Sequence, residues 1–390
     1  MTPMKVFPRA ARRSVSRLLG LGCLIMSAFA SPATAESVDV WFGTTTPREG
    51  PSKGIYHATF DTESGKLSPA ELAAEIDGPG FLAKHPGGTM LYAAASDNGK
   101  PSIVAYRIER QEDQTRLVKD SSVETGDGGA AHVSVSRDGK VVLSAQYGGG
   151  STAAYRLAPN GSLLERSDLE KHPEGSGVVA GRQEKAHAHW TGTSPDDRFA
   201  FVPDLGMDRV VIYKLNTDQG TLEPHGYGVC PQGGGPRHMK FDPSGERIYV
   251  LNELSLSVTV FNYDPEAGTM TAVQTVPTLS EAVKDGERFN SASEIRVHPT
   301  GKFVYSANRG NDTITVFSVL EPSGQLRVIQ VQPIHGAWPR NFNLDPTGKW
   351  LLAAGRNTNS VTIFEIDPDS GKLQFTMDSV MVPTPICVTF

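Results

Sequence analysis

The sequence predicts an all-β fold, a seven-bladed β-propeller built from four-stranded antiparallel blades. Three observations lead to this prediction: a motif that recurs along the chain, a second landmark that occurs seven times, and short runs of strand-forming residues inside each repeat. Repeats of this length indicate stacked units that bury one continuous core together. They argue against the separate domains that a chain of 390 residues would usually form.

The first observation is a segment that reappears in altered form. Phe241–Glu253 reads FDPSGERIYVLNE, and its turn and apolar run return in Val297–Arg309 (VHPTGKFVYSANR) and Leu344–Arg356 (LDPTGKWLLAAGR). Degenerate copies start near Lys84, Val135 and Thr193. The second landmark is a turn followed by Leu or Met, with successive occurrences 46 to 59 residues apart. Its positions are Leu67, Leu117, Leu163, Leu222, Met270, Leu326 and Leu373.

The third observation is the strand character of each repeat. Ser257–Tyr263 and Asp312–Phe317 alternate β-branched and aromatic residues with polar ones, and Pro, Gly, Asp and Asn bound them. No window predicts an amphipathic helix. A unit of about fifty residues with four short strands has the size of a propeller blade. Because one blade cannot bury both of its faces, the blades are expected to stack around an axis.

The two ends of the repeat region predict how the ring closes. Thr384–Phe390 aligns with Gly235–Phe241, which is the first strand of a repeat. The last strand of the chain is therefore expected to begin a blade that the N-terminal strand, starting at Val38–Phe42, continues. Such closure removes the exposed sheet edges. We expect residues 36–390 to form a single propeller domain.

Residues 1–35 predict a cleaved secretory signal peptide. They contain five basic residues and no acidic one, an apolar stretch from Leu18 to Ala30, and then Ala33-Thr34-Ala35. We therefore expect a periplasmic or secreted protein. The Arg12-Arg13 pair partly resembles a twin-arginine export signal.

The net charge of the mature chain limits the kinds of partner that it can bind. The 37 basic and 43 acidic residues of the whole chain become 32 and 43 without the leader, a net charge of −11. This balance argues against nucleic acid and against an anionic membrane surface. We expect a monomer that binds a small molecule and needs no cofactor. Cys230 and Cys387 remain, either as a disulfide, which export permits, or as two buried thiols.

Counting from the turns places particular side chains together. Arg237 and Glu253 each lie eight positions from Gly245, so they are expected to face each other across a hairpin. The same register in the other repeats puts functional groups around one mouth of the ring. These are His189, Arg237, Glu253, Arg309, Arg340 and Arg356. The next register adds His132, His238, Glu294 and Asn341.

This set of side chains predicts a ligand site. A single Arg beside a Glu is usually a structural pair, but four arginines, a histidine and a carboxylate on one rim of an acidic protein would concentrate an anionic ligand. We expect His187 and His189, in Ala-His-Ala-His, to point in opposite directions and therefore not to share a metal.

The residues also carry a family pattern. The motifs are His187-Ala-His189, Pro203–Arg209, Gly235-Pro-Arg-His238, Asn252-Glu-Leu254, Asn308-Arg-Gly310 and Pro339-Arg-Asn341. Together they resemble the seven-bladed propeller lactonase family, which includes propeller-type 6-phosphogluconolactonases and the fungal carboxy-cis,cis-muconate cyclase, over about residues 38–390. The resemblance implies lactone hydrolysis with His189, Arg237, Glu253 and Arg309 in the site. Gln146 and Gly355 depart from the pattern at positions where Asn is common.

A mechanism can be assigned to these residues as a hypothesis. Arg237 and Arg309 would stabilise the tetrahedral oxyanion. His189, with an intrinsic pKa near neutrality, would be the general base, and Glu253, with a pKa lowered by arginines, would orient it; Glu253 as the base remains the alternative. The expected substrate-binding residues are Arg340, Arg356, Asn341, His132 and His238. The chain lacks the G-x-S-x-G sequence of serine hydrolases.

The substrate and two rival functions stay open. A phosphorylated lactone would match the arginines but does not fit an exported protein. Glucono-1,5-lactone or another aldonolactone fits an exported protein but leaves the arginines partly unexplained. A lactone that carries a carboxylate fits both the arginines and export. The rivals are a cyclase acting on a muconate, for which clustered arginines are also apt, and a non-catalytic secreted binding module. A binding module would not need His189, Arg237, Glu253 and Arg309 to converge.

Overall fold

The structure is a computed structural model that describes residues 37–48, 50–111, 114–286 and 289–390. The chain divides into two units, Met1–Thr34 and Ala35–Phe390, and the description concerns the second. The predicted signal peptide, residues 1–35, lies outside the described residues.

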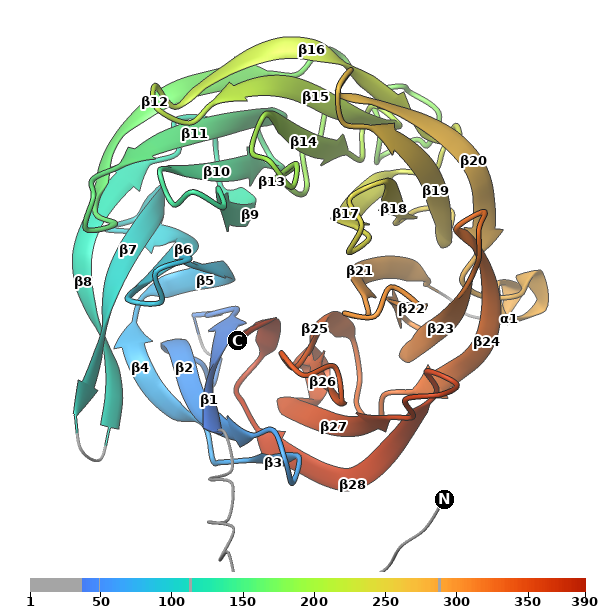
Figure 1. The fold of residues 1–390 in the computed structure, drawn as a ribbon. Coiled ribbons are helices and arrows are strands. Elements are labelled where there is room, and N and C mark those ends of the chain that lie inside the picture. The colour runs from blue at the N-terminus through green and yellow to red at the C-terminus, as the bar shows by residue number, and fades with distance from the viewer. Residues whose placement is uncertain (1–36, 49, 112–113, 287–288) are drawn as a thin grey trace, which may run out of the picture. The chain divides into compact units, whose positions relative to one another are not determined.

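Over the described residues the strands form seven antiparallel sheets, arranged as blades around an axis (Figure 1). The first blade contains β1 (Ser37–Thr44), β2 (Gly54–Asp61), β3 (Lys66–Leu67), β4 (Glu71–Glu75) and β29 (Pro385–Thr389). The second contains β5 (Asp77–Lys84), β6 (Met90–Asp97), β7 (Lys100–Gln111) and β8 (Gln114–Glu124). The third contains β9 (Ala130–Val135), β10 (Val141–Gln146), β11 (Ser151–Leu157) and β12 (Leu163–Lys171). The fourth contains β13 (Gly192–Thr193), β14 (Phe199–Asp204), β15 (Arg209–Asn216) and β16 (Thr221–Val229).

In the second to seventh blades the strands follow chain order from the axis outward (Figure 1). The fifth contains β17 (Pro236–Phe241), β18 (Arg247–Asn252), β19 (Ser257–Asp264) and β20 (Thr269–Pro277). The sixth contains β21 (Ser291–Val297), β22 (Phe303–Arg309), β23 (Thr313–Leu320) and β24 (Gln325–Pro333). The seventh contains β25 (Pro339–Leu344), β26 (Trp350–Gly355), β27 (Ser360–Ile366) and β28 (Leu373–Met381). The predicted all-β, seven-bladed fold is confirmed.

The predicted ring closure is also confirmed. β29 pairs with β1 in antiparallel fashion, with Trp41 opposite Thr389 and Phe42 opposite Val388. The C-terminal strand is therefore the innermost strand of the blade whose other strands come from the N-terminal side (Figure 1). Hydrogen bonds between β29 and β1 therefore join the two ends of the repeat region and close the ring.

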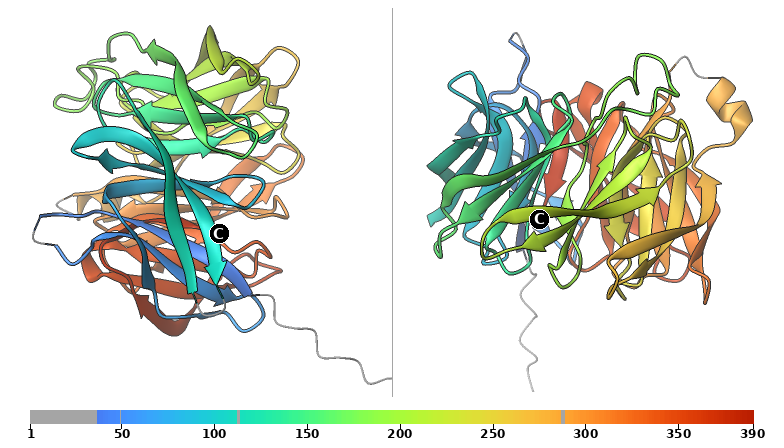
Figure 2. Two further views of the ribbon diagram at one scale, coloured as in Figure 1. Left: turned by 90° about the vertical axis from the view of Figure 1, so that its left-hand side faces the viewer. Right: turned by 90° about the horizontal axis from the view of Figure 1, so that it is seen from above.

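Helical structure among the described residues is short. α1 (Glu281–Asp285) has no buried side chain and projects at the edge of the ring (Figure 2). A 3₁₀ turn, η1 (Arg356–Thr358), follows β26 directly. Within the described ranges, no helix has the length and apolar character needed to cross a bilayer.

The predicted hairpin register is wrong by one residue. Arg237 was expected opposite Glu253, but Pro236 pairs with Asn252 and His238 with Leu251, so Arg237 is the extra residue of a β-bulge. A bulge leaves one residue unpaired and re-aims its side chain. The two side chains still meet, because the bulge turns Arg237 toward the end of β18.

The same irregularity recurs on the inner strands of other blades. Arg340 lies between the pairs Pro339–Gly355 and Asn341–Ala354, and Ala131 occupies the equivalent place in β9. Two of the six residues that the repeat alignment places at the mouth, Arg237 and Arg340, are therefore bulge residues. Because these two arginines hold the same position in their blades, turn counting placed both at the mouth in spite of the wrong pairing.

Buried tyrosines tie neighbouring blades together. The hydroxyl groups of Tyr92, Tyr249 and Tyr305 donate to main-chain carbonyls of the following blade, at Gly161, Gly324 and Gly371. Across the closure, the indole Nε1 of Trp350 donates to the carbonyl of Thr62 over 2.9 Å. Apolar blade faces pack around these contacts, so each blade covers a face that its neighbour could not bury alone.

Tyr305→Phe tests this link. The Tyr305 hydroxyl donates to the carbonyl of Gly371 over 3.0 Å in a buried site, so its loss leaves an acceptor unsatisfied. We expect urea denaturation to show a loss of about 1–2 kcal/mol in the free energy of unfolding. Tyr227→Phe, at a tyrosine that is 47% exposed, should stay within about 0.5 kcal/mol of the unaltered protein. Equal effects of the two changes would contradict the assignment.

Candidate active site

A cavity of about 400 Å³ lies where the loops and strand ends of several blades converge. Its lining residues are Gly129, Ala130, Ala131, Tyr147, Arg182, His189, Glu253, Arg309 and Arg340. We call it the mouth cavity. A smaller cavity of about 90 Å³ shares Ala130, Ala131 and Arg340 with it and adds Arg237 and His238. The two cavities therefore adjoin, and between them they include five of the six residues predicted at the mouth.

Glu253 is the electrostatic centre of this site. Its Oε2 accepts from Nε of Arg237 at 2.8 Å and lies 3.1 Å from Nη2 of Arg309, and its Oε1 accepts from Nη2 of Arg182 at 2.7 Å. Burial acts to raise the pKa of this carboxyl, but the positive charges of Arg309 and Arg237 and the hydrogen bond from Arg182 outweigh burial and lower the pKa to about 2. The predicted lowering is confirmed. Glu253 is thus an anion that holds three cations in place rather than a proton acceptor at neutral pH.

Arg182 is a site residue that the repeats do not predict. This residue lies outside the repeated strands, in the long connection between β12 and β13. Burial acts to lower its pKa, but hydrogen bonds to Glu253 and Tyr147 and the negative charge of Glu253 together outweigh burial, so the pKa is raised. The one available signal was the longest landmark spacing, from Leu163 to Leu222, which indicated extra residues in this repeat. Spacing alone does not say where an inserted side chain points.

His189 is a buried, neutral imidazole on the wall of the mouth cavity. Only 5% of the residue is exposed, and its main-chain N–H donates to the carbonyl of Pro203. Burial, followed by the positive charges of Arg237 and other neighbours, holds its pKa well below the ordinary value of 6.5. The near-neutral pKa assumed from the sequence does not apply in this environment. The ring is free to accept a proton but is a weaker base than a solvated histidine.

Arg340 is a cation that lies close to Arg309 in this site. It lines both cavities, and among the described residues its side chain has no hydrogen bond or ion pair. Burial and the nearby Arg309 lower its pKa to about 10, so it keeps its charge at neutral pH. Arg356 instead begins the 3₁₀ turn after β26 and lines neither of these two cavities.

The second predicted ring of residues is engaged with the protein. Nδ1 of His132 accepts from the main-chain N–H of Thr191 at 3.3 Å, and its ring packs 4.0 Å from that of Phe81. Asn341 donates to Glu294 and accepts from the N–H of Val388. Of this ring, His238 also lines the smaller cavity. Direct contact of His132, His238 and Asn341 with a substrate stays a prediction.

The expectation that His187 and His189 point in opposite directions is wrong. Side chains two residues apart on an extended segment share a side, and both rings contact Tyr147, at centroid distances of 4.4 and 5.4 Å. Nδ1 of His187 lies 2.8 Å from the carbonyl oxygen of Tyr147. In the part of the chain that the structure describes, no three His, Cys, Asp or Glu side chains form a group that could hold a metal. Cys230 and Cys387 are buried thiols and are not bonded to each other.

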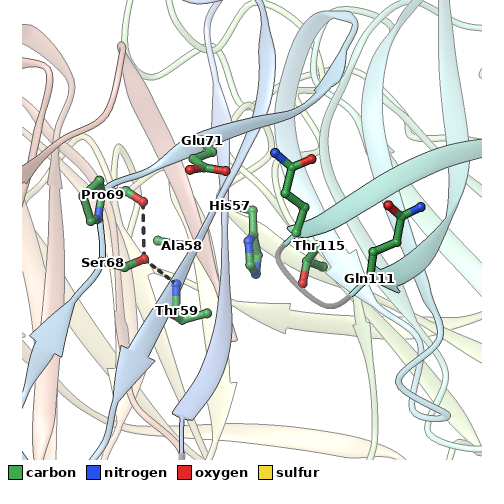
Figure 3. A pocket seen from close by; sticks show the side chains of 9 residues that line it. His57, Ala58, Thr59, Ser68, Pro69, Glu71, Gln111 and Thr115 are labelled. Atoms are coloured by element: carbon green, nitrogen blue, oxygen red, sulfur yellow. Dashed lines mark hydrogen bonds between the residues drawn. The ribbon is translucent and has the colours of Figure 1, made fainter.

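Another cavity, of about 350 Å³, is lined by strands of the first and second blades (Figure 3). This cavity contains His57, whose Nε2 is hydrogen-bonded to Oδ1 of Asp39 at 2.8 Å. Asp39 also forms an ion pair with Arg110. Ser68 is likewise held by main-chain partners at Thr59 and Pro69 (Figure 3). Since no arginine lines this cavity, it does not share the cationic character of the mouth cavity.

Fold and cavity together define a closed β-propeller with a cationic cavity at its mouth. The chain belongs to the seven-bladed β-propeller lactonase family, whose model matches residues 39–390. The predicted resemblance is confirmed.

Similar proteins agree with this membership. The chain is 35% identical over 342 residues to a 6-phosphogluconolactonase of Bacillus subtilis, covering 88% of this chain and 95% of that one. It is 31% identical to a 6-phosphogluconolactonase of Formosa agariphila, covering 76% and 83%. Among solved structures, the periplasmic gluconolactonase of Pseudomonas aeruginosa superimposes with a TM-score of 0.82 at 28% identity, covering 91% of this chain and 99% of that one. These relatives, named 6-phosphogluconolactonase and gluconolactonase, agree with membership of the lactonase family.

Glu253→Gln tests the electrostatic centre. The pKa of Glu253 is lower in the folded chain, about 2, than its ordinary value of 4.5, so its ionisation stabilises the fold above pH 4.5, and this contribution is lost as the pH falls through about 2. We expect the variant to be less stable by about 3 kcal/mol at neutral pH and the difference to shrink steadily toward pH 2 in urea denaturation.

Glu266→Gln is the matched control, because 87% of that side chain is exposed. It should change the free energy of unfolding by no more than about 0.5 kcal/mol across the same pH range. A destabilisation by Glu253→Gln that is the same at every pH would show that charge compensation is not its cause.

Proposed function

We propose that this protein hydrolyses a sugar lactone to the aldonic acid. The proposed substrate is glucono-1,5-lactone or another aldonolactone, met in the periplasm or outside the cell. The observation that carries the proposal is the mouth cavity, where a neutral imidazole, a clamped carboxylate and an unpaired guanidinium line one space. The predicted leader supports the location, and the Pseudomonas aeruginosa relative, named a periplasmic gluconolactonase, supports both substrate and location.

Lactone hydrolysis needs a nucleophilic water and a stabilised oxyanion. Water adds to the carbonyl carbon, the ring C–O bond then breaks, and the proton taken from water goes to the departing ring oxygen. Neutral His189 is the group proposed to take that proton and return it. Arg237 and Arg309 are held rigidly by Glu253, so their N–H groups are preorganised toward charge that develops in the transition state.

The charge balance of the site favours an acyl compound with anionic character. Arg182, Arg237, Arg309 and Arg340 face one carboxylate, Glu253, which leaves an excess of positive charge around the cavity. A developing oxyanion uses part of this excess. A phosphate or carboxylate on the substrate would use the rest, with Arg340 as its partner.

A panel of aldonolactones, with and without phosphate and carboxylate groups, tests the activity and separates the substrate classes. Acid release measured at constant pH should show turnover of at least one member, whereas a binding module would turn over none. In His189→Ala, kcat should fall by about 10²–10⁴-fold. His225→Ala, at a histidine on the outer strand β16, should keep full activity. Full activity of His189→Ala would remove His189 from the proposed mechanism.

Arg182→Ala tests the residue that the repeats did not reveal. Loss of one of the cations on Glu253 should loosen the remaining pair and lower kcat/KM by about 10-fold or more. Because a third of the Arg182 side chain is exposed, the free energy of unfolding should change by less than about 1 kcal/mol. Lys185→Ala, on the same loop, removes a cation that donates to the carbonyl of Gly148, the one partner of its side chain among the described residues, and should leave kcat/KM unchanged. Equal losses in both variants would point to loop disturbance.

A further inference from the structure

A second imidazole and a second carboxylate lie behind His189. The rings of His189 and His238 are in edge contact, with centroids 5.3 Å apart, and Nδ1 of His238 is 3.0 Å from Oε1 of Glu294. All three residues are at most 5% exposed. The mechanism described above uses His189 but neither His238 nor Glu294.

Glu294 is held in one orientation. Its Oε1 also accepts from the main-chain N–H of Ile295 at 2.9 Å, its Oε2 accepts from Nδ2 of Asn341, and Nη2 of Arg296 lies 3.5 Å away. A carboxylate only accepts hydrogen bonds, so Nδ1 of His238 must be the protonated nitrogen of that ring. Burial, followed by the charge of Arg237, keeps the pKa of His238 well below 6.5, so its ring is neutral and Nε2 carries a lone pair.

Two ring nitrogens remain without partners. Among the described residues, neither Nε2 of His238 nor Nδ1 of His189 has a hydrogen bond, although both are buried. An unsatisfied buried polar atom costs about 1–3 kcal/mol. Since the two rings touch, each nitrogen is the natural partner of the other, directly or through one water. Catalytic hydrogen bonds commonly tighten only when substrate binds.

We propose that Glu294 and His238 are positioning residues that set the tautomer of His189. Glu294 keeps the proton of His238 on Nδ1, Nε2 of His238 accepts from Nδ1–H of His189, and Nε2 of His189 presents its lone pair to the mouth cavity. This inference deepens the lactonase function proposed above and rests on it.

The hydrogen bonds from His189 through His238 to Glu294 would offset the free-energy cost of placing a positive charge on the buried His189 ring. Burial and the surrounding arginines disfavour a positive charge on His189, yet the ring must gain one as it removes a proton from water. Hydrogen bonds through His238 to the Glu294 carboxylate stabilise that charge, as the buried carboxylate does for the histidine of serine hydrolases. The other titratable or charged groups around the two rings are His132, Arg237, Lys240, Arg296, Arg309, Arg340 and Cys387.

Glu294→Gln is the first test, on a lactone that the protein turns over. We expect kcat to fall by about 10–100-fold with KM nearly unchanged, and the acid limb of the kcat profile to move to lower pH because a negative charge behind the imidazole is lost. In a His189→Ala background the same change should have no further effect, since positioning residues act only through the group they position. An equal loss in both backgrounds would overturn the proposal.

Matched variants separate positioning from folding. Glu294→Asp keeps the charge and should recover part of kcat, and Ser134→Ala, at another buried polar side chain, should keep full activity. Should Glu294→Gln fail to fold, as judged by circular dichroism, His238→Gln carries the same double-variant test. Full kcat in a folded Glu294→Gln or His238→Gln protein would also overturn the proposal.

An imidazole ¹⁵N spectrum of histidine-labelled protein reads the tautomer without any substrate. His189, assigned by its disappearance in His189→Gln, should carry its proton on Nδ1 in the unaltered protein and lose this preference in Glu294→Gln. A proton on Nε2 in the unaltered protein would refute the relay even if lactones are hydrolysed. The expected tautomer together with no turnover of any lactone would instead refute the proposed function.

Discussion

A buried carboxylate surrounded by guanidinium groups is the interaction on which the mouth of this propeller depends. Arg237 and Arg309 are almost fully buried, and each would be costly to remove from water without a fixed negative charge nearby. Glu253 supplies that charge, and the nearby cations lower its pKa and so hold it ionised. The same attraction brings Arg182 in from a loop. The ion pairs that compensate the charge of Glu253 therefore also fix the geometry of the site.

The propeller makes this cluster possible because each blade contributes the end of a strand to one mouth. Glu253 follows β18, Arg309 ends β22, and Arg237 and Arg340 occupy bulges on the inner strands β17 and β25. A bulge on the innermost strand turns a side chain that would otherwise follow the pleat. The tyrosine bridges between blades and the β1–β29 pairing keep these contributions in register around the ring.

The site divides its charged groups between structure and reactivity. Three arginines are bound to Glu253, whereas Arg340 is left with no partner among the residues that the structure describes. Burial and the surrounding positive charges keep His189 neutral. In the proposed mechanism the same arginines stabilise the oxyanion, so they also weaken the proposed base. The Glu294 carboxylate, connected to His189 through His238 in the proposed arrangement, would stabilise the positive charge that His189 gains as a base. Membership of the lactonase family is consistent with this division of roles.

The sequence alone determined the blade number, the closure of the ring and the positions around the mouth, because all three depend on local repeats: turns at Gly245, Gly301 and Gly348 recur with the same strand pattern. Family motifs pointed to His189, Arg237, Glu253 and Arg309. Only the tertiary structure decided how these side chains are held. The bulge at Arg237 lies in the pairing of β17 with β18. The arrival of Arg182 from a non-repeated loop, the low pKa of His189 and the His238–Glu294 pair come from contacts between blades. Periodicity within one repeat carries no information about such contacts, since burial and charge at the axis are properties of the assembled ring.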